Sequence, residues 1–203
     1  NLLKSSDINL TEEILNSDNT KISIRDFDII ENISEGGYGI VYLARKRATD
    51  DIFAIKRINK NYLRKKNLFK FIENETNILT NIDNQYVVKC YYTFSDENYI
   101  YFVMEYLNGG DLSFMLSKLN TIDEKYVKIY SAEIILALVY LHSNDIIHRD
   151  LKPANIMFDS NGHIKLTDFG LSEFNYDMND NKDKVYGTEN YLAPELILGE
   201  PHG

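Results

Sequence analysis

The sequence has very little cysteine and no long apolar run. Cys90 is the only cysteine among 203 residues, so neither an intramolecular disulfide nor a cysteine-based zinc site can be built. We expect Cys90 to be a buried small hydrophobe rather than a reactive thiol. No segment approaches the roughly 20 apolar residues that span a bilayer, and the start of the chain lacks the pattern of a secretion signal. These absences predict no membrane insertion and a cytoplasmic or nuclear location.

Basic charge is also scarce. Lys and Arg number 22 against 31 Asp and Glu, which gives a formal net charge of -9 at pH 7. Nucleic acids and anionic membranes bind basic surfaces, so we expect no nucleic-acid partner. A hydrophobic content of 44% is enough to form a real core. Because the chain begins at Asn1 instead of Met and stops just after an apolar run, we expect it to be a fragment.

Hydrophobic patterning predicts a tail followed by a β-rich domain. Residues 1–22 are polar and weakly patterned, as expected of an N-terminal tail. Residues 23–106 form the predicted first domain. Its strands are expected around 26–34, 39–45, 51–57, 87–94 and 99–105. Between the third and fourth strands, helical spacing places on one stripe Leu68, Phe71, Ile72, Ile78, Leu79 and Ile82.

A second domain is predicted over residues 107–203, after a glycine-containing break at 107–110. Its main helix is expected from about 122 to 142, and Thr121 with Glu124 predicts a capping box at its start. The buried stripe of this helix is expected at Tyr126, Tyr130, Ile134, Ala137, Leu138 and Leu141.

One carboxylate interrupts the apolar stripe of the first helix. Glu75 lies three to four positions after two apolar residues of that stripe, where an unpaired charge would be costly. In the preceding strand, Phe53-Ala54-Ile55-Lys56, alternation places Ala54 and Lys56 on the same face. A solvent-facing lysine is the usual interpretation of a lone Lys. Here a pairing would explain both the carboxylate on the apolar stripe and the lysine that shares a strand face with Ala54, and we predict an ion pair between Lys56 and Glu75.

Three further segments carry polar motifs. Residues 148–155 read His-Arg-Asp-Leu-Lys-Pro-Ala-Asn, and Asp168-Phe169-Gly170 lies 18 positions after Asp150. Residues 187–195 read Gly-Thr-Glu-Asn-Tyr-Leu-Ala-Pro-Glu. Near the start of the first domain, residues 33–41 form a glycine-rich turn that has Ser34 where a further glycine is usual. By itself this turn fits either a phosphate-binding loop or an ordinary hairpin.

The order and spacing of these motifs resemble the catalytic domain of eukaryotic Ser/Thr protein kinases over residues 26 to 203. Residues 148–155 match the pattern H-R-D-L-x-x-x-N at all five fixed positions. The resemblance implies an α+β, bilobal protein-kinase-like fold. It has a five-stranded antiparallel N-lobe sheet with one main helix, and a mainly helical, incomplete C-lobe. Residues 33–34, 168–172 and 191–196 look most like the AGC group, near the Greatwall and microtubule-associated Ser/Thr kinases.

The resemblance implies an enzyme that moves the γ-phosphoryl group of ATP onto a Ser or Thr hydroxyl of a protein substrate. Asp150 would orient the attacking hydroxyl and accept its proton, Lys152 would face the transferring phosphate, and Thr188 would steady both. Mg2+ would be held by Asn155 and Asp168, which offer hard oxygen ligands. Lys152 at the second position after Asp150 favours Ser/Thr over Tyr as the acceptor.

The same resemblance assigns an ATP site. Lys56 would contact the α- and β-phosphates while Glu75 holds it, and Ala54 would leave room for the adenine. Met104 would be the gatekeeper, and a hinge near 105–107 would hydrogen-bond the adenine. The full predicted set is Ile33, Ser34, Glu35, Gly36, Gly37, Tyr38, Gly39, Val41, Ala54, Lys56, Glu75, Met104, Glu105, Leu107, Asp111 and Met157.

Activity and regulation leave alternatives open. An active kinase, a pseudokinase acting as a nucleotide-binding or scaffolding module, and an inert fragment all fit a kinase-like sequence, and we expect the fragment itself to be poorly active. The retained lysine, catalytic aspartate and metal aspartate favour an active parent protein. Arg149 needs an anionic partner, and we hypothesise that Asp177, Asp180 or Asp183 supplies it permanently. The other interpretation of that segment is a solvated disordered loop.

Overall fold

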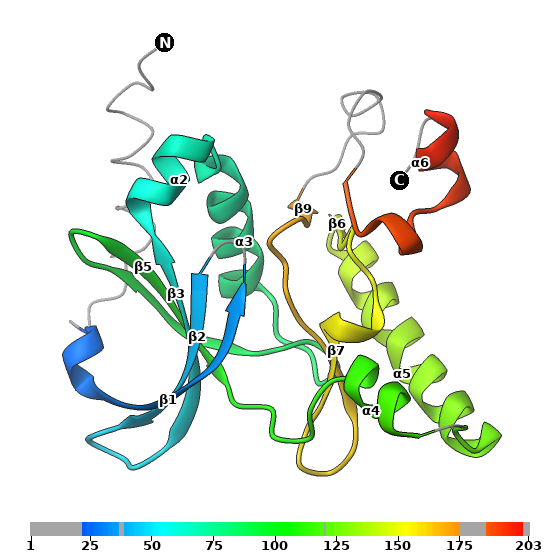
Figure 1. Cartoon of the computed structure of the whole chain (residues 1–203), viewed down its shortest axis with the longest axis horizontal. Helices are drawn as coiled ribbons and strands as arrows, with labels where there is room; N and C mark the ends of the chain where they lie inside the picture. Colours follow the sequence, from blue (N-terminus) through cyan, green and yellow to red (C-terminus); the bar gives the residue numbers. More distant parts are fainter. Residues whose placement is uncertain (1–21, 37–38, 120, 175–185, 201–203) are drawn as a thin grey trace. The chain divides into compact units, whose positions relative to one another are not determined.

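A computed structural model describes residues 22–36, 39–119, 121–174 and 186–200 (Figure 1). Residues 1–21 of the predicted tail therefore lie outside the described residues. By internal contacts the chain divides into two compact units. The first unit comprises Asn1–Thr76 and Lys89–Tyr106, and the second comprises Asn77–Val88 and Leu107–Gly203.

The first unit contains a five-stranded sheet in the order β1-β2-β3-β5-β4, with every neighbouring pair antiparallel (Figure 1). This confirms the predicted five-stranded antiparallel sheet. A short 3-10 helix, Ile24–Asp26, leads into it and is capped by Ser23. The strands are β1 Phe27–Gly36, β2 Gly39–Lys46, β3 Ile52–Asn59, β4 Cys90–Ser95 and β5 Tyr99–Glu105.

The register of the sheet decides which side chains share a face. Val41 of β2 pairs with Lys56 of β3, and Ala54 of β3 pairs with Met104 of β5. Cross-strand partners point to the same side, so these four residues share one face. The opposite face forms an apolar cluster, and burying it stabilises the sheet. That cluster contains Phe27, Ala44, Phe53, Ile55, Phe94, Tyr101 and Val103.

Two helices follow β3, where the sequence predicted one. Helix α2 (Lys60–Lys66) begins at Asn59, whose side chain accepts from the backbone N–H of Tyr62, and it ends at Asn67 in a left-handed conformation. Helix α3 (Phe69–Asn81) is the predicted main helix. Lys60, the first residue of α2, is only 5% exposed, and its ammonium donates to the Ser95 hydroxyl at 3.2 Å.

The second unit combines helices with two small sheets. Strands β6 and β9 pair antiparallel, as do β7 and β8, and α5 packs against β8 (Figure 1). The helices are α4 Leu112–Lys118, α5 Glu124–Ser143 and α6 Pro194–Leu198, with 3-10 turns at Pro153–Asn155 and Glu189–Tyr191. The strands are β6 Ile146–Ile147, β7 Ile156–Phe158, β8 Ile164–Leu166 and β9 Glu173–Phe174.

Helix α5 differs from its prediction at its start. Its N-cap is Asp123, whose carboxylate accepts from the backbone N–H of Lys125, so the predicted capping box of Thr121 with Glu124 was wrong. Tyr126 is 49% exposed, although it was assigned to the buried stripe. Farther along, Ala137 and Leu141 are fully buried, as predicted. Over the described ranges, no helix has the length and apolarity that crossing a bilayer requires.

Candidate active site

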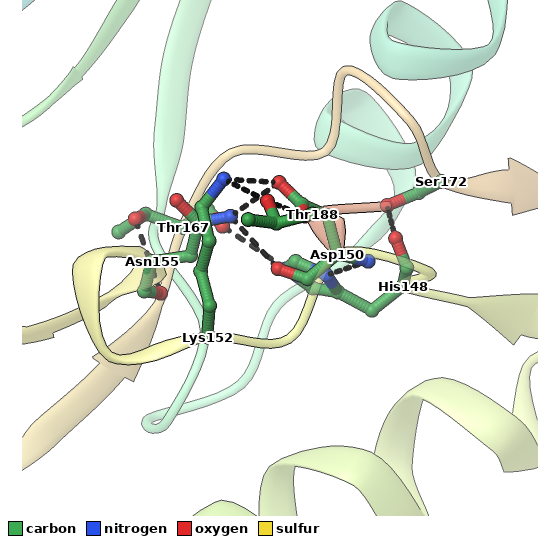
Figure 2. Close-up of polar contacts among 7 residues, drawn as sticks. All are labelled: His148, Asp150, Lys152, Asn155, Thr167, Ser172 and Thr188. Atoms are coloured by element: carbon green, nitrogen blue, oxygen red, sulfur yellow. Dashed lines mark hydrogen bonds and ion pairs between the residues drawn. The ribbon is translucent and has the colours of Figure 1, made fainter. Parts of the chain in front are cut away.

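The segment that follows β6 presents a buried carboxylate with several donors. Asp150 accepts hydrogen bonds from Lys152 Nζ at 2.7 Å, from Thr188 Oγ1 at 2.7 Å and from Asn155 Nδ2 at 3.1 Å (Figure 2). The Lys152 ammonium also donates to Thr188 Oγ1 at 2.7 Å. Lys152 and Thr188 are 36 positions apart in the sequence, and the fold brings them to the same carboxylate.

The electrostatics of Asp150 favour the ionised form. Burial would raise the pKa of this carboxyl, but the hydrogen bonds from Lys152 and Thr188, together with the positive charge of Lys152, hold its pKa below the ordinary value. Asn155 adds a further donor. Asp150 is therefore a carboxylate at neutral pH, with its oxygens oriented by fixed donors.

His148 fixes the backbone that precedes this carboxylate. Its Nδ1 accepts from the backbone N–H of Asp150 at 3.3 Å, so its Nε2 carries the proton and donates to the Thr167 carbonyl at 3.0 Å. Burial lowers the pKa of His148, which is consistent with this neutral form. The Ser172 hydroxyl donates to the His148 carbonyl at 3.0 Å (Figure 2). Hydrogen bonds thereby link the segments that carry Thr167 and Ser172 to the loop that carries Asp150.

Arg149 is held by partners that sequence reasoning did not identify. Its Nη1 donates to Glu173 Oε2 at 2.5 Å, and its Nε donates to the Leu171 carbonyl at 2.7 Å. The Tyr186 ring lies 4.3 Å from the guanidinium carbon. Asp177, Asp180 and Asp183, which the sequence suggested as partners, lie outside the described residues. No pattern in the sequence links Glu173 to Arg149, which lies 24 positions earlier.

Asn155 and Asp168 offer oxygen ligands suited to Mg2+. The amide nitrogen of Asn155 points to Asp150, so its amide oxygen is the atom left to bind a cation. The backbone N–H of Thr167 donates to the Asn155 carbonyl at 3.0 Å. The exposed Asp168 directly follows Thr167, the residue that makes this contact. Mg2+ is commonly bound by one or two such ligands plus phosphates and water. The residues present therefore fit Mg2+, although no cluster of three or more His, Cys, Asp or Glu in the described ranges could hold a metal.

In the first unit, Lys56 and Glu75 form the predicted ion pair. Lys56 Nζ lies 2.5 Å from Glu75 Oε1, and the two side chains are 14% and 2% exposed. Strand β3 supplies the ammonium, and helix α3 supplies the carboxylate. A buried charge is tolerated when it is paired, so this geometry explains how Glu75 can lie on the apolar side of its helix.

The glycine-rich turn is the hairpin that joins β1 and β2. Ile33, Ser34 and Glu35 lie on β1, and Gly36 pairs with Gly39. A Cβ at Gly39 would lie 2.2 Å from the Arg57 carbonyl oxygen, so only glycine fits this close approach. Gly37 and Tyr38 lie outside the described residues. A phosphate-binding role for this turn stays a prediction.

The remaining ATP-site candidates divide between the units. In the first, Met104 shares a sheet face with Ala54 and Lys56, and the backbone N–H of Glu105 donates to the Lys89 carbonyl at 2.9 Å. In the second, Leu107 is buried. The Asp111 carboxylate caps α4 through the backbone N–H of Phe114 at 2.8 Å, and Asp111 also forms a β-bridge with the half-buried Met157. Asp111 therefore has a structural role, and its ligand role stays a prediction.

Comparison with known proteins gives consistent matches. A family model described as "Protein kinase domain" matches residues 27–203. The chain is 42% identical over 234 residues to "Probable serine/threonine protein kinase IRE4" of Arabidopsis thaliana, covering 100% of the chain and 22% of that protein. It is 52% identical over 151 residues to "Probable serine/threonine-protein kinase pkgA" of Dictyostelium discoideum, covering 74% of the chain and 11% of that protein.

For a third relative, the match covers a larger share of the relative's own length. "Serine/threonine-protein kinase AtPK1/AtPK6" of Arabidopsis thaliana is 37% identical over 195 residues, covering 94% of the chain and 42% of that protein. The chain thus spans less than half the length of each of these three curated relatives.

Proposed function

Because this chain belongs to the protein kinase domain family, we propose that it transfers the γ-phosphoryl group of MgATP to Ser and Thr hydroxyls of protein substrates. The observation that carries the proposal is the buried Asp150 carboxylate, held by Lys152, Thr188 and Asn155. Phosphoryl transfer needs little covalent chemistry from the protein. It depends on positioning and on stabilising charge, which this arrangement supplies.

Asp150 acts on the acceptor hydroxyl. Its lowered pKa keeps it ionised, so it can accept a hydrogen bond from the hydroxyl and take the proton as the new phosphorus–oxygen bond forms. The bond from the γ-phosphorus to the β–γ bridging oxygen breaks in the same transfer, and ADP leaves with that oxygen. Lys152 lies 2.7 Å from this carboxylate and stabilises negative charge on the transferring phosphoryl group. The Thr188 hydroxyl contacts both side chains and holds them in fixed positions relative to each other.

The proposed nucleotide and metal contacts are assigned residue by residue. Lys56, oriented by Glu75, neutralises the α- and β-phosphates. Asn155 and Asp168 would hold Mg2+, which when bound would supply positive charge to stabilise the phosphates. Adenine contacts are proposed for the sheet face that carries Val41, Ala54 and Met104, and for the hinge residues near 105–107.

Acceptor specificity and finer classification are also proposals. Support for Ser/Thr over Tyr comes from Lys152 beside Asp150 and from the names of the relatives, which all describe Ser/Thr kinases. We further propose an AGC-group kinase near the Greatwall and microtubule-associated types, on the residues at 33–34, 168–172 and 191–196.

The proposed function is tested with radiolabelled ATP and a peptide library in which Ser, Thr or Tyr is the only acceptor. The full-length protein should label Ser and Thr peptides, and its Asp150→Asn variant should not. Equal labelling by both proteins would show a contaminating kinase and reject the assignment. ATP binding without transfer in the wild type would instead support a nucleotide-binding module.

A further inference from the structure

The ion pair between Arg149 and Glu173 is nearly as buried as the Lys56–Glu75 pair, yet no step of the proposed reaction uses it. The two side chains are 7% and 17% exposed, and Nη1 lies 2.5 Å from Oε2. A guanidinium at this depth is stable only with an anion beside it. Glu173 supplies that anion from within the chain, 24 positions after Arg149.

Arg149 directly precedes Asp150, and its backbone is in an uncommon conformation. Its φ is +61°, in the left-handed region that non-glycine residues rarely adopt. Such a conformation persists when its surroundings enforce it. Here the enforcing contacts are the Leu171 carbonyl, the Glu173 carboxylate and the Tyr186 ring. The side chain of Arg149 thus fixes the backbone from which the Asp150 carboxylate projects.

Glu173 is itself placed by the main chain. It lies on β9, directly opposite Ile147 of β6, in the antiparallel pair that ends one residue before His148. The Ser172 hydroxyl adds a bond to the His148 carbonyl at 3.0 Å. The segment from Asp168 to Glu173 therefore carries both a proposed magnesium ligand and the anion that holds the Asp150 loop.

Kinases that are switched by phosphorylation commonly use a new phosphate to pair with an arginine and order the active conformation. In this chain a carboxylate already contacts Arg149. We propose that Glu173 is a positioning residue, a permanent anion that holds Arg149 and thereby Asp150, so that phosphoryl transfer needs no phosphorylated residue paired with Arg149. This inference rests on the proposed function.

The test compares full-length wild type, Glu173→Gln and Glu173→Asp, with Glu124→Gln as the matched control. Glu124 pairs with Lys128 at 2.7 Å, but both of these side chains are more than 70% exposed. Loss of the Glu173 charge should lower kcat by about 10- to 100-fold, because the nearly buried hydrogen bond from Arg149 to Glu173 then loses its charge assistance. KM for ATP should stay within about two-fold, and Glu173→Asp should retain more activity than Glu173→Gln. Glu124→Gln should behave as wild type.

A second arm needs no variant. Wild-type protein stripped of phosphate by a protein phosphatase, and checked by intact mass, should keep most of its kcat. A third arm follows amide hydrogen exchange over residues 147–155, which should be at least about 10-fold faster in Glu173→Gln than in wild type or Glu124→Gln.

The outcomes separate the two proposals. A Glu173→Gln protein with wild-type kcat, or a wild type that loses its activity with its phosphate, would overturn the permanent-anion proposal while leaving the kinase assignment intact. If the wild type transfers no phosphate at all, the proposed function fails. Hydrogen exchange still decides whether Glu173 positions the loop, since unchanged exchange in Glu173→Gln would reject that role.

Discussion

Replacing Lys56 by Met should destabilise the fold and abolish nucleotide binding, and these two effects can be separated. The Lys56 ammonium lies 2.5 Å from the Glu75 carboxylate, which is 2% exposed. Lys56→Met removes the cation while the carboxylate stays buried. Removing one member of a buried pair typically costs about 3–5 kcal/mol, so we expect a loss of that size in the free energy of unfolding.

The double variant Lys56→Met/Glu75→Leu tests the physical cause. Replacing both members of a buried ion pair by apolar residues is often neutral or stabilising, so the free energy of unfolding should return to within about 1 kcal/mol of wild type. Binding of an ATP analogue should not return, because the cation proposed to contact the phosphates is still missing. Lys128→Met breaks an exposed pair with Glu124 and should cost less than about 1 kcal/mol.

Urea denaturation gives the free energies of unfolding, and calorimetric titration with the ATP analogue gives the affinities. The reasoning would be refuted if Lys56→Met lost no more stability than Lys128→Met. It would also be refuted if the double variant were as unstable as Lys56→Met, since the cost would then not come from the buried carboxylate.

Three further perturbations have defined outcomes. Thr188→Val removes a charge-assisted hydrogen bond to Asp150 and should lower kcat by about 10- to 100-fold in steady-state assays, whereas unchanged kcat would mean that the bond is dispensable. Glu133 raises the pKa of His163 above its ordinary 6.5, so the stability that this pair adds should be present below pH 6.5 and decline as the pH rises through the raised pKa. The unfolding temperatures of wild type and His163→Gln should therefore converge at pH values above the raised pKa of His163, and a difference that stays constant with pH would contradict the coupling. Gly187→Ala forces a Cβ to within 2.8 Å of a backbone carbonyl at a φ of +118° and should destabilise by about 1–3 kcal/mol, whereas wild-type stability would show that the strain is relieved.

Much of the first unit was predictable because local patterns decide it. Alternation in β3 placed Ala54 and Lys56 on one face, and the cost of burying Glu75 required a cation, so the ion pair followed from the sequence. Helix α2 was not predicted, because its seven residues are mostly charged and only Leu63 gives an apolar signal. Its signals are the caps Asn59 and Asn67, which are recognisable only once the strand end is known.

The second unit shows where sequence reasoning ends. The motif at 148–155 identified Asp150, but its contact with Thr188, 38 positions away, was expected only from the family resemblance, because no local pattern links the two residues. Glu173 was missed for the same reason, since its partnership with Arg149 depends on the β6–β9 register and not on spacing along a helix or strand. At the start of α5, two acidic residues and a Thr compete for the cap, and Asp123 forms it because its carboxylate reaches the backbone N–H of Lys125.

The most direct test of the central claim is the phosphoryl-transfer rate of full-length Asp150→Asn, measured beside its affinity for MgATP. If the ionised Asp150 carboxylate orients the hydroxyl and takes its proton, kcat should fall by about 10²- to 10⁴-fold while MgATP affinity stays within about two-fold. A variant that keeps the wild-type kcat would contradict the account.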